Sequence, residues 1–110
     1  MNNVSSPRSD DDSVEQEIVR KNLTAPRVKP ADIEACIIKT AFHVFPDTQL
    51  TVCCLTLQNG FTVTGESACA SPQNFDADLG QRIAHENAKQ KIWALEGYRL
   101  KSKLHEGAAK

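Results

Sequence analysis

The sequence predicts a small α+β domain in which a β-hairpin packs with a long C-terminal amphipathic helix and short N-terminal helices. Two runs rich in β-branched and apolar residues flank an Asn-Gly pair at 59–60, and a helical apolar stripe follows over residues 76–96. The length of 110 residues allows one domain with a modest core. A composition of 40% hydrophobic and 25% charged residues is typical of a globular protein.

The ordered domain is expected over residues 13–106. Residues 1–12 contain one valine and no aromatic residue, so they bury too little apolar surface to offset the entropy of ordering, and we expect a disordered tail. Residues 107–110 are expected to be a frayed C-terminus. We interpret the whole chain as a single α+β domain with two loose ends.

Charge and hydropathy exclude several function classes. The formal net charge is −1, so no global positive field attracts nucleic acid, which we disfavour as a partner. No apolar run approaches the roughly 20 residues of a membrane span, and the N-terminus lacks a signal-peptide pattern. We therefore expect a protein that stays in the cytoplasm where it is made and has no membrane partner.

Two N-terminal helices are expected. Ser13 and Gln16 match a capping box, which predicts a short helix over residues 14–22. The residues expected to face inward are Val14, Ile18 and Val19. Pro30 suits the first turn of a second helix, which is expected to run to about Phe42 and to end before the next proline. Its apolar residues at helical spacing are Ile33, Cys36, Ile37, Ala41 and Val44.

The strongest local signal is a hairpin. Residues 50–57 (LTVCCLTL) and 61–65 (FTVTG) are strand-like and flank the Asn-Gly pair, which suits a turn that needs positive φ. A two-residue turn would place Thr56 opposite Val63. Both faces are then partly apolar, and a lone hairpin is marginal in water. We therefore expect a helix, another strand or a second subunit to cover it.

The longest element is a helix expected over residues 76–96. Asn74 or Asp76 is suited to cap its N-terminus, and Gly97 is expected to stop it. Its apolar stripe consists of Leu79, Ile83, Ala84, Ala88, Ile92 and Leu95. We expect Trp93 to be a core or dimer contact rather than a platform for a ligand.

The four cysteines are interpreted as reduced. They are Cys36, Cys53, Cys54 and Cys69. No secretion signal and no Cys-x-x-Cys pair accompanies them, so we expect small buried hydrophobes rather than disulfides. The histidines, at 43, 85 and 105, lie far from any cluster with metal-ligand spacing. We expect no metal and no cofactor.

Two motifs carry weak chemical signals. Cys69 and His85 could act as nucleophile and base, but nothing in the sequence supplies an activating environment, and a structural cysteine explains the same residue. Glu66 and Ser67, beside Gly65, could form an anion-binding turn. Ordinary turn geometry explains those residues equally well. We therefore expect no catalytic residues and no enzyme.

A positive bias toward the C-terminus is the remaining candidate. The residues are Arg82, Lys89, Lys91, Arg99, Lys101 and Lys103. The simple interpretation is a solvated helix face. The alternative is that some of them hold phosphates while Phe61, Phe75 or Tyr98 stacks on a base, since the planar guanidinium of arginine pairs with phosphate in two places.

Two stretches carry a family resemblance. They are residues 23–33, and residues 59–72 with Asn74-Phe75-Asp76, Gly80 and residues 92–98. Over about residues 14–104 the chain resembles the gene-49/gene-66 family of small tailed-phage proteins of podoviruses. That family is similar to the first type of anti-Thoeris sponge, whose members sequester cyclic ADP-ribose isomers; related sponges trap cyclic oligonucleotides.

The resemblance implies a phage-encoded, non-catalytic anti-defence protein that binds a small nucleotide second messenger. It also implies a homo-oligomer with ligand pockets between subunits. From chemistry and motif position we expect Phe61, Asn74 and Phe75 to contact the base, and Arg82 and Arg99 to contact phosphates. The alternative function is a phage accessory module that inhibits or adapts a host protein through an exposed apolar patch.

Overall fold

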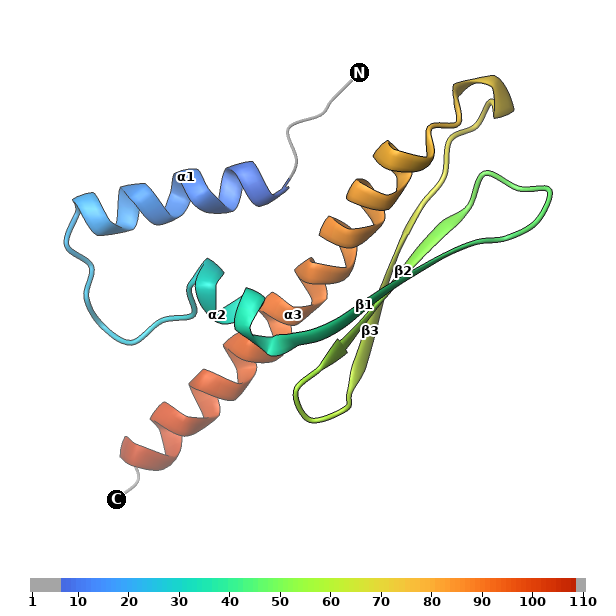
Figure 1. Cartoon of the computed structure of the whole chain (residues 1–110). Coiled ribbons are helices and arrows are strands. Elements are labelled where there is room, and N and C mark those ends of the chain that lie inside the picture. Colours follow the sequence, from blue (N-terminus) through green and yellow to red (C-terminus); the bar gives the residue numbers. More distant parts are fainter. Residues whose placement is uncertain (1–6, 109–110) are drawn as a thin grey trace.

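The computed structural model describes residues 7–108 and confirms the α+β class (Figure 1). Its elements in chain order are α1 (Pro7–Arg20), α2 (Pro30–Cys36), β1 (Ile37–Val44), β2 (Thr51–Leu57), β3 (Thr62–Ser67), the 3-10 turn η1 (Pro72–Asn74) and α3 (Ala77–Ala108). The strands form an antiparallel sheet in the order β1-β2-β3. Helix α3 packs across β2 and β3, and α1 lies apart from the sheet.

Strand β1 replaces the second half of the expected N-terminal helix. Helix α2 ends at Cys36, and the chain continues as an extended strand from Ile37 to Val44. This segment is rich in β-branched and aromatic residues, which favour a pleated conformation. The prediction that the helix runs to Phe42 was wrong. The apolar spacing of this segment fits a helix as well as a strand, and hydrogen bonding to β2 stabilises the strand.

The Asn-Gly turn is confirmed, with a loop of three residues instead of two. Gly60 donates its N–H to the carbonyl of Leu57 at 2.9 Å, and Leu57 donates to the carbonyl of Phe61 at 2.8 Å. Gly60 has a φ of +90°, which a residue with a side chain adopts only with strain. The Asn59 side-chain oxygen accepts the N–H of Phe61 at 3.0 Å. The extra loop residue shifts the pairing of the two strands.

The register of the hairpin therefore differs from the expected one by a single residue. Val63 pairs with Leu55, whereas a two-residue turn would place it opposite Thr56. Because side chains alternate between faces, a shift of one residue moves Val63 to the opposite face of the sheet. The face that carries it is covered by α3, and Val63 is buried there with Leu55.

The core lies between this face and α3. Its buried hydrophobic residues are Ile33, Cys53, Leu55, Leu57, Val63, Ala84, Ala88 and Ile92. At Gly65 the strand and the helix touch through their backbones: a Cβ placed there would lie 2.2 Å from the nitrogen of Ala88 and 2.3 Å from the carbonyl oxygen of Ala84. The sheet and the helix pack this closely only because all three residues are small.

Helix α3 is longer than expected. Asp76, one of the two residues predicted to cap the helix, is its N-cap. Its carboxylate accepts a hydrogen bond from the N–H of Leu79 at 2.9 Å. The helix then passes through Gly97 and continues to Ala108, over 32 residues. The prediction of a stop at Gly97 was wrong. An internal glycine destabilises a helix by only about 1 kcal/mol, so Gly97 does not end it. Residues 107–108, which were expected to fray, are helical. Residues 109–110 lie outside the described residues.

Helix α1 begins at Pro7, earlier than the expected start at Ser13. Part of the segment expected to be a disordered tail is thus helical, and residues 1–6 lie outside the described residues. The side chain of Trp93 in α3 donates to the carboxylate of Asp11 at 3.0 Å. This tertiary contact connects the first half of α1 to the domain, and the composition of residues 1–12 does not predict it.

The inward face of α1 is more polar than expected. Val14 and Val19 are 57% and 64% exposed, so the prediction that they face inward was wrong, and Ile18 is half-buried. The contact that faces the domain is an ion pair, in which Arg27 bonds both carboxylate oxygens of Glu15 at 2.5 and 3.0 Å. This pair lowers the pKa of Glu15, chiefly through the hydrogen bonds from the guanidinium.

All four cysteines are free thiols. Cys53 is buried, whereas Cys36, Cys54 and Cys69 are only partly buried, so the prediction that most of them are buried was wrong. Among residues 7–108, no group of His, Cys, Asp and Glu side chains is arranged to hold a metal ion. None of the helices described there combines the length and the apolar composition that crossing a bilayer requires.

We predict that Gly65→Ala destabilises the fold by about 1–3 kcal/mol or more, because its methyl group would overlap backbone atoms of α3. The matched control is Gly97→Ala, the same change at a helical position with nothing within 4 Å. It is expected to stabilise the fold by up to about 1 kcal/mol. Urea unfolding followed by circular dichroism measures both. Equal effects of the two substitutions would contradict the backbone contact at Gly65.

We also predict a loss of stability in alkaline solution. Burial, assisted by the adjacent Cys54, raises the pKa of the Cys53 thiol from 9.0 to about 11. The folded state holds this proton more tightly, so the stabilisation is fully present below about pH 9 and is lost as pH rises through 11. The expected loss is about 2–3 kcal/mol. Unfolding under reducing conditions at pH 8 and pH 11 tests it, and Cys53→Ala should show a smaller pH dependence than Cys69→Ala.

Candidate functional site

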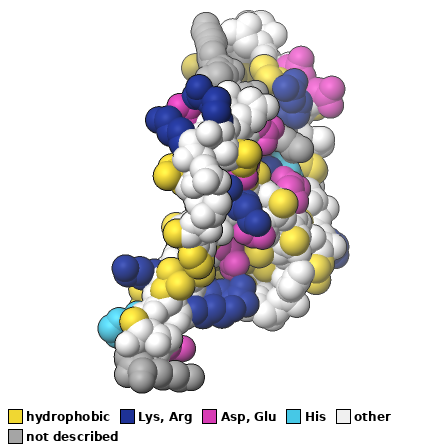
Figure 2. Space-filling model, turned by 90° about the vertical axis from the view of Figure 1, so that its left-hand side faces the viewer, with side chains coloured by type: hydrophobic (Ala, Val, Ile, Leu, Met, Phe, Trp, Pro, Cys, Tyr) yellow, Lys and Arg dark blue, Asp and Glu magenta, His cyan; other side chains and the backbone are white. Residues whose placement is uncertain are grey.

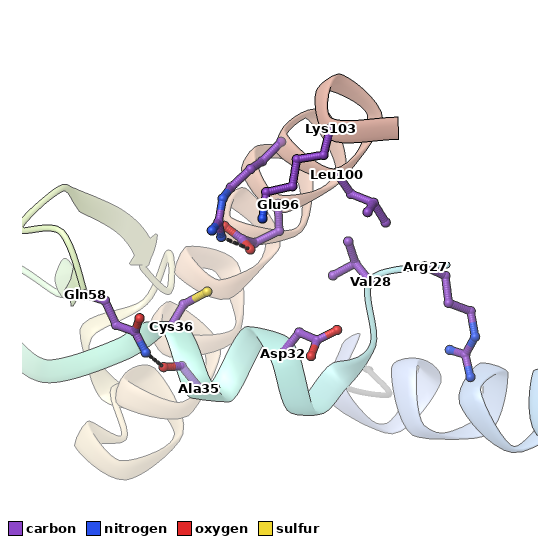
Figure 3. Close-up of a pocket in the computed structure, with 10 residues that line it drawn as sticks. Arg27, Val28, Asp32, Ala35, Cys36, Gln58, Glu96, Leu100 and Lys103 are labelled. Atoms are coloured by element: carbon purple, nitrogen blue, oxygen red, sulfur yellow. Dashed lines mark hydrogen bonds and ion pairs between the residues drawn. The ribbon is translucent and has the colours of Figure 1, made fainter. Parts of the chain in front are cut away.

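A groove of about 280 Å³ lies where four parts of the chain meet: the connector between α1 and α2 (residues 21–29), α2, the β2–β3 turn and the second half of α3 (Figure 3). Its lining residues are Arg27, Val28, Asp32, Ala35, Cys36, Gln58, Glu96, Arg99, Leu100 and Lys103. This volume is near the lower end of the roughly 300–1,000 Å³ of small-molecule pockets. The groove combines apolar, cationic and acidic side chains, which makes it the candidate binding site.

Local hydrogen bonds fix one wall of the groove. The carboxylate of Asp32 accepts the N–H of Lys29 at 2.9 Å and so caps α2 where the connector enters it. At the other end of α2, the side chain of Gln58 donates to the carbonyl of Ala35 at 2.6 Å. This bond fastens the β2–β3 turn to α2 (Figure 3).

The opposite wall is one face of α3. Glu96 is followed by Arg99 and Leu100 three and four residues later, and Lys103 follows these two by four and three residues. Such spacings place all four side chains on the same side of the helix. Figure 3 shows Leu100 of α3 and Val28 of the connector on facing sides of the groove. These two side chains provide its apolar surface.

The cations of the groove differ in how they are engaged. The guanidinium of Arg27 turns away toward α1, where it pairs with Glu15 (Figure 3). Arg99 pairs with Glu96 at 3.1 Å, and its side chain is 61% exposed. Lys103 has no ion-pair partner among the described residues. Arg99 and Lys103 are therefore the cations available to a ligand in the groove.

The thiol of Cys36 lies in the groove without the features of a nucleophile. Burial raises its pKa, and the nearby carboxylate of Glu96 raises it further, against a smaller opposite effect of Arg99. A thiol with a raised pKa stays protonated at neutral pH, and the thiolate is the reactive form. Cys36 thus contributes packing to the groove rather than reactivity.

The residues expected to bind a ligand lie in several places. Arg99 lines the groove. Asn74 and Phe75 line a separate cavity of about 90 Å³ at the start of α3. Phe61 is on the β2–β3 turn and 56% exposed, and Arg82 is exposed on α3. Arg82 and Arg99 are 17 residues apart, or about 26 Å along the helix. A single chain does not bring these five residues together.

Most of the groove was not predicted from the sequence. Asp32 and Glu96 were not identified, nor was the apolar pair of Val28 and Leu100, and Lys103 was named only as one member of the C-terminal positive bias. The available signal was the regular spacing of charged and apolar residues after position 95. An expected helix end at Gly97 divided that pattern and concealed it.

Other sequence candidates have structural explanations. The thiol of Cys69 donates to the carbonyl of Ser71 at 3.3 Å, and no hydrogen bond joins it to His85, whose ring lies 6.5 Å from that of Phe42. Residues 66–67, for which an anion-binding turn was one of two interpretations, belong to β3. Lys89 is buried and pairs with Glu34 and Glu86.

The face that carries α1 and α2 has mixed charge. Figure 2 shows basic, acidic and hydrophobic side chains interspersed there, without a broad area of one sign. An interface with nucleic acid requires clustered positive charge, and this face does not provide it.

Comparison with known proteins places the chain in a family. No curated protein and no solved structure matches it significantly. Residues 28–104 match the Phage protein (N4 Gp49/phage Sf6 gene 66) family. The match includes α2, the whole sheet, most of α3 and every groove residue from Val28 to Lys103. The chain therefore belongs to this family of bacteriophage proteins.

Proposed function

We propose that this phage protein is a non-catalytic binding protein that sequesters a nucleotide-derived immune signal, a cyclic ADP-ribose isomer or a cyclic oligonucleotide, and so counters host defence. The proposed site is the groove beside α3. The observation that supports it is the combination, within about 280 Å³, of available cations, carboxylate acceptors and an apolar surface. The resemblance to the first type of anti-Thoeris sponge is part of this proposal.

The chemistry of a nucleotide fits these groups one by one. Arg99 and Lys103 would bind phosphate oxygens, with the phosphate replacing Glu96 as the partner of Arg99. Asp32 and Glu96 would accept hydrogen bonds from ribose hydroxyls. A base would lie against the apolar side chains of Val28 and Leu100.

A non-catalytic role is supported by the side chains that line the groove. They include no histidine, and the one thiol, Cys36, has a raised pKa. General acid–base and nucleophilic catalysis depend on groups that change protonation near neutral pH or are activated by a neighbour. A ligand would thus be held and released unchanged.

Sequestration depends on stoichiometry and affinity. The dissociation constant must lie below the concentration of the signal, and the protein must be as abundant as the signal. The groove is open and small for a dinucleotide, so the proposal includes a homo-oligomer in which a second copy completes its wall. Phe61, Asn74, Phe75 and Arg82, which lie elsewhere on one chain, are the candidates for that contribution.

We predict that the purified protein depletes a cyclic ADP-ribose isomer from solution at a fixed stoichiometry and returns it intact after heat denaturation. Chromatography of the released ligand checks this. Recovery of a cleaved product would show an enzyme and overturn the proposal. Retention of a host protein, with no small molecule bound, would favour the protein-interaction alternative.

We expect Arg99→Ala to weaken binding about 10- to 100-fold, since a hydrogen bond to a charged group contributes about 1.5–3 kcal/mol. The matched control is Lys101→Ala, which removes a cation from the same exposed stretch of α3 without touching the groove. It should change the affinity less than about twofold. Isothermal titration calorimetry measures both, and similar losses in the two variants would place the site elsewhere.

A further inference from the structure

The side chain of Arg27 lines the groove, but its charged end is bound outside it. The guanidinium is directed toward α1 (Figure 3), where it bonds both carboxylate oxygens of Glu15 at 2.5 and 3.0 Å. Each side chain of this pair is 26% exposed. Water therefore reaches both charges, and an ion pair that water screens contributes little to stability. Another anion can thus replace Glu15 as the partner of Arg27.

The guanidinium of Arg27 lies within electrostatic range of the groove. The pKa of Arg27 is raised, chiefly by its hydrogen bonds to Glu15; desolvation opposes this effect, and the charges of Glu15 and Asp32 add to it. Asp32 is a groove residue on α2. An arginine side chain has several bonds with staggered minima, so its charged end can turn from α1 to the groove while the connector stays in place.

The net charge of the groove depends on the direction of Arg27. Among residues 7–108, the other charged side chains of the lining are two cations, Arg99 and Lys103, and two carboxylates, Asp32 and Glu96. With Arg27 on α1 the lining is therefore neutral, and with Arg27 turned inward it is positive. A ligand with two phosphates carries at least two negative charges, and a planar guanidinium pairs with a phosphate through two hydrogen bonds. Such a ligand binds better when Arg27 points inward.

We propose that Arg27 is a further phosphate-binding residue of the groove, and that Glu15 of α1 competes with the ligand for it. The groove is that of the proposed function, on which this inference rests. The ligand class is a nucleotide with two phosphates, bound by Arg27 from the connector and by Arg99 and Lys103 from α3. Glu15 lowers the affinity for this ligand, and by linkage the ligand weakens the attachment of α1 to the domain.

Trp93 reports whether α1 is attached. It is the one tryptophan of the sequence, and its indole N–H donates to the carboxylate of Asp11 in α1 at 3.0 Å. Trp93 does not line the groove, so a ligand bound there does not contact the indole. Loss of the α1 contact exposes the indole to water and shifts its fluorescence to longer wavelengths. We expect this shift when the wild-type protein is saturated with ligand, and no such shift in Arg27→Ala.

The competition is tested by isothermal titration calorimetry at fixed ionic strength, with inorganic pyrophosphate and a cyclic ADP-ribose isomer as probes. We expect Glu15→Gln to tighten binding about three- to fivefold, the range that corresponds to one weak ion pair. In an Arg27→Ala background the same change should have no effect, because no guanidinium is left to release. The matched control is Glu17→Gln, also on α1, where the carboxylate pairs with Arg20 and Lys21. It should change the affinity less than about 1.5-fold, since solvent and salt screen its charge.

Several results would overturn the proposal. They are weaker or unchanged binding in Glu15→Gln, equal tightening in the Arg27→Ala background, and constant Trp93 fluorescence at saturation. If Arg99→Ala still weakens binding in that case, the proposed function stands without the competition. Conversely, binding of pyrophosphate that depends on Arg27 and Glu15, with no binding of the cyclic ADP-ribose isomer, would support the competition and oppose the proposed function. Binding of neither probe would overturn both.

Discussion

The close approach of α3 to β3 determines the rest of the architecture. Because Gly65, Ala84 and Ala88 have little or no side chain, the backbones of helix and strand touch, and α3 lies over β2 and β3. The helix is too narrow to cover a third strand as well, so β1 stays exposed. Its 32 residues also carry it past the end of the sheet, where its last turns form one wall of the groove. The exposure of β1 and the formation of the groove thus both follow from the packing of α3 on β2 and β3.

Much of the fold was predictable, because strong local signals agreed with the tertiary structure. The Asn-Gly turn, the cap at Asp76 and the α+β class follow from turn chemistry and hydrophobic periodicity. The segment Ile37–Val44 was not predictable in this way, since its apolar spacing fits a helix and its composition fits a strand. Only pairing with β2 resolves the ambiguity. The face of the sheet that Val63 occupies was also not predictable. One additional loop residue moves Val63 to the opposite face, and residue propensities do not predict the length of the loop.

The site was harder to predict than the fold. Arg99 was identified from its charge and planar shape, but its neighbours in the groove come from three segments far apart in sequence. Because the helix was expected to end at Gly97, Glu96 and Lys103 were assigned to different elements. In the structure both lie on one face of α3. Asn74 and Phe75 fall beside a different cavity, because the start of α3 is about 30 Å from the groove at 1.5 Å per residue. The predicted residues were chosen by residue type, and residue type does not tell how far apart they lie along the helix.

The attachment of α1 includes contacts that respond to salt. Two polar contacts join it to the rest of the chain, Asp11 with Trp93 and Glu15 with Arg27, and Val14 and Val19 are exposed. Such contacts weaken with ionic strength and acidity, whereas apolar packing does not. The depressed pKa of Glu15 keeps its ion pair intact until the solution becomes distinctly acidic. Rising salt is therefore expected to loosen the hold of Arg27 on α1 while the apolar packing between α3 and the sheet stays intact.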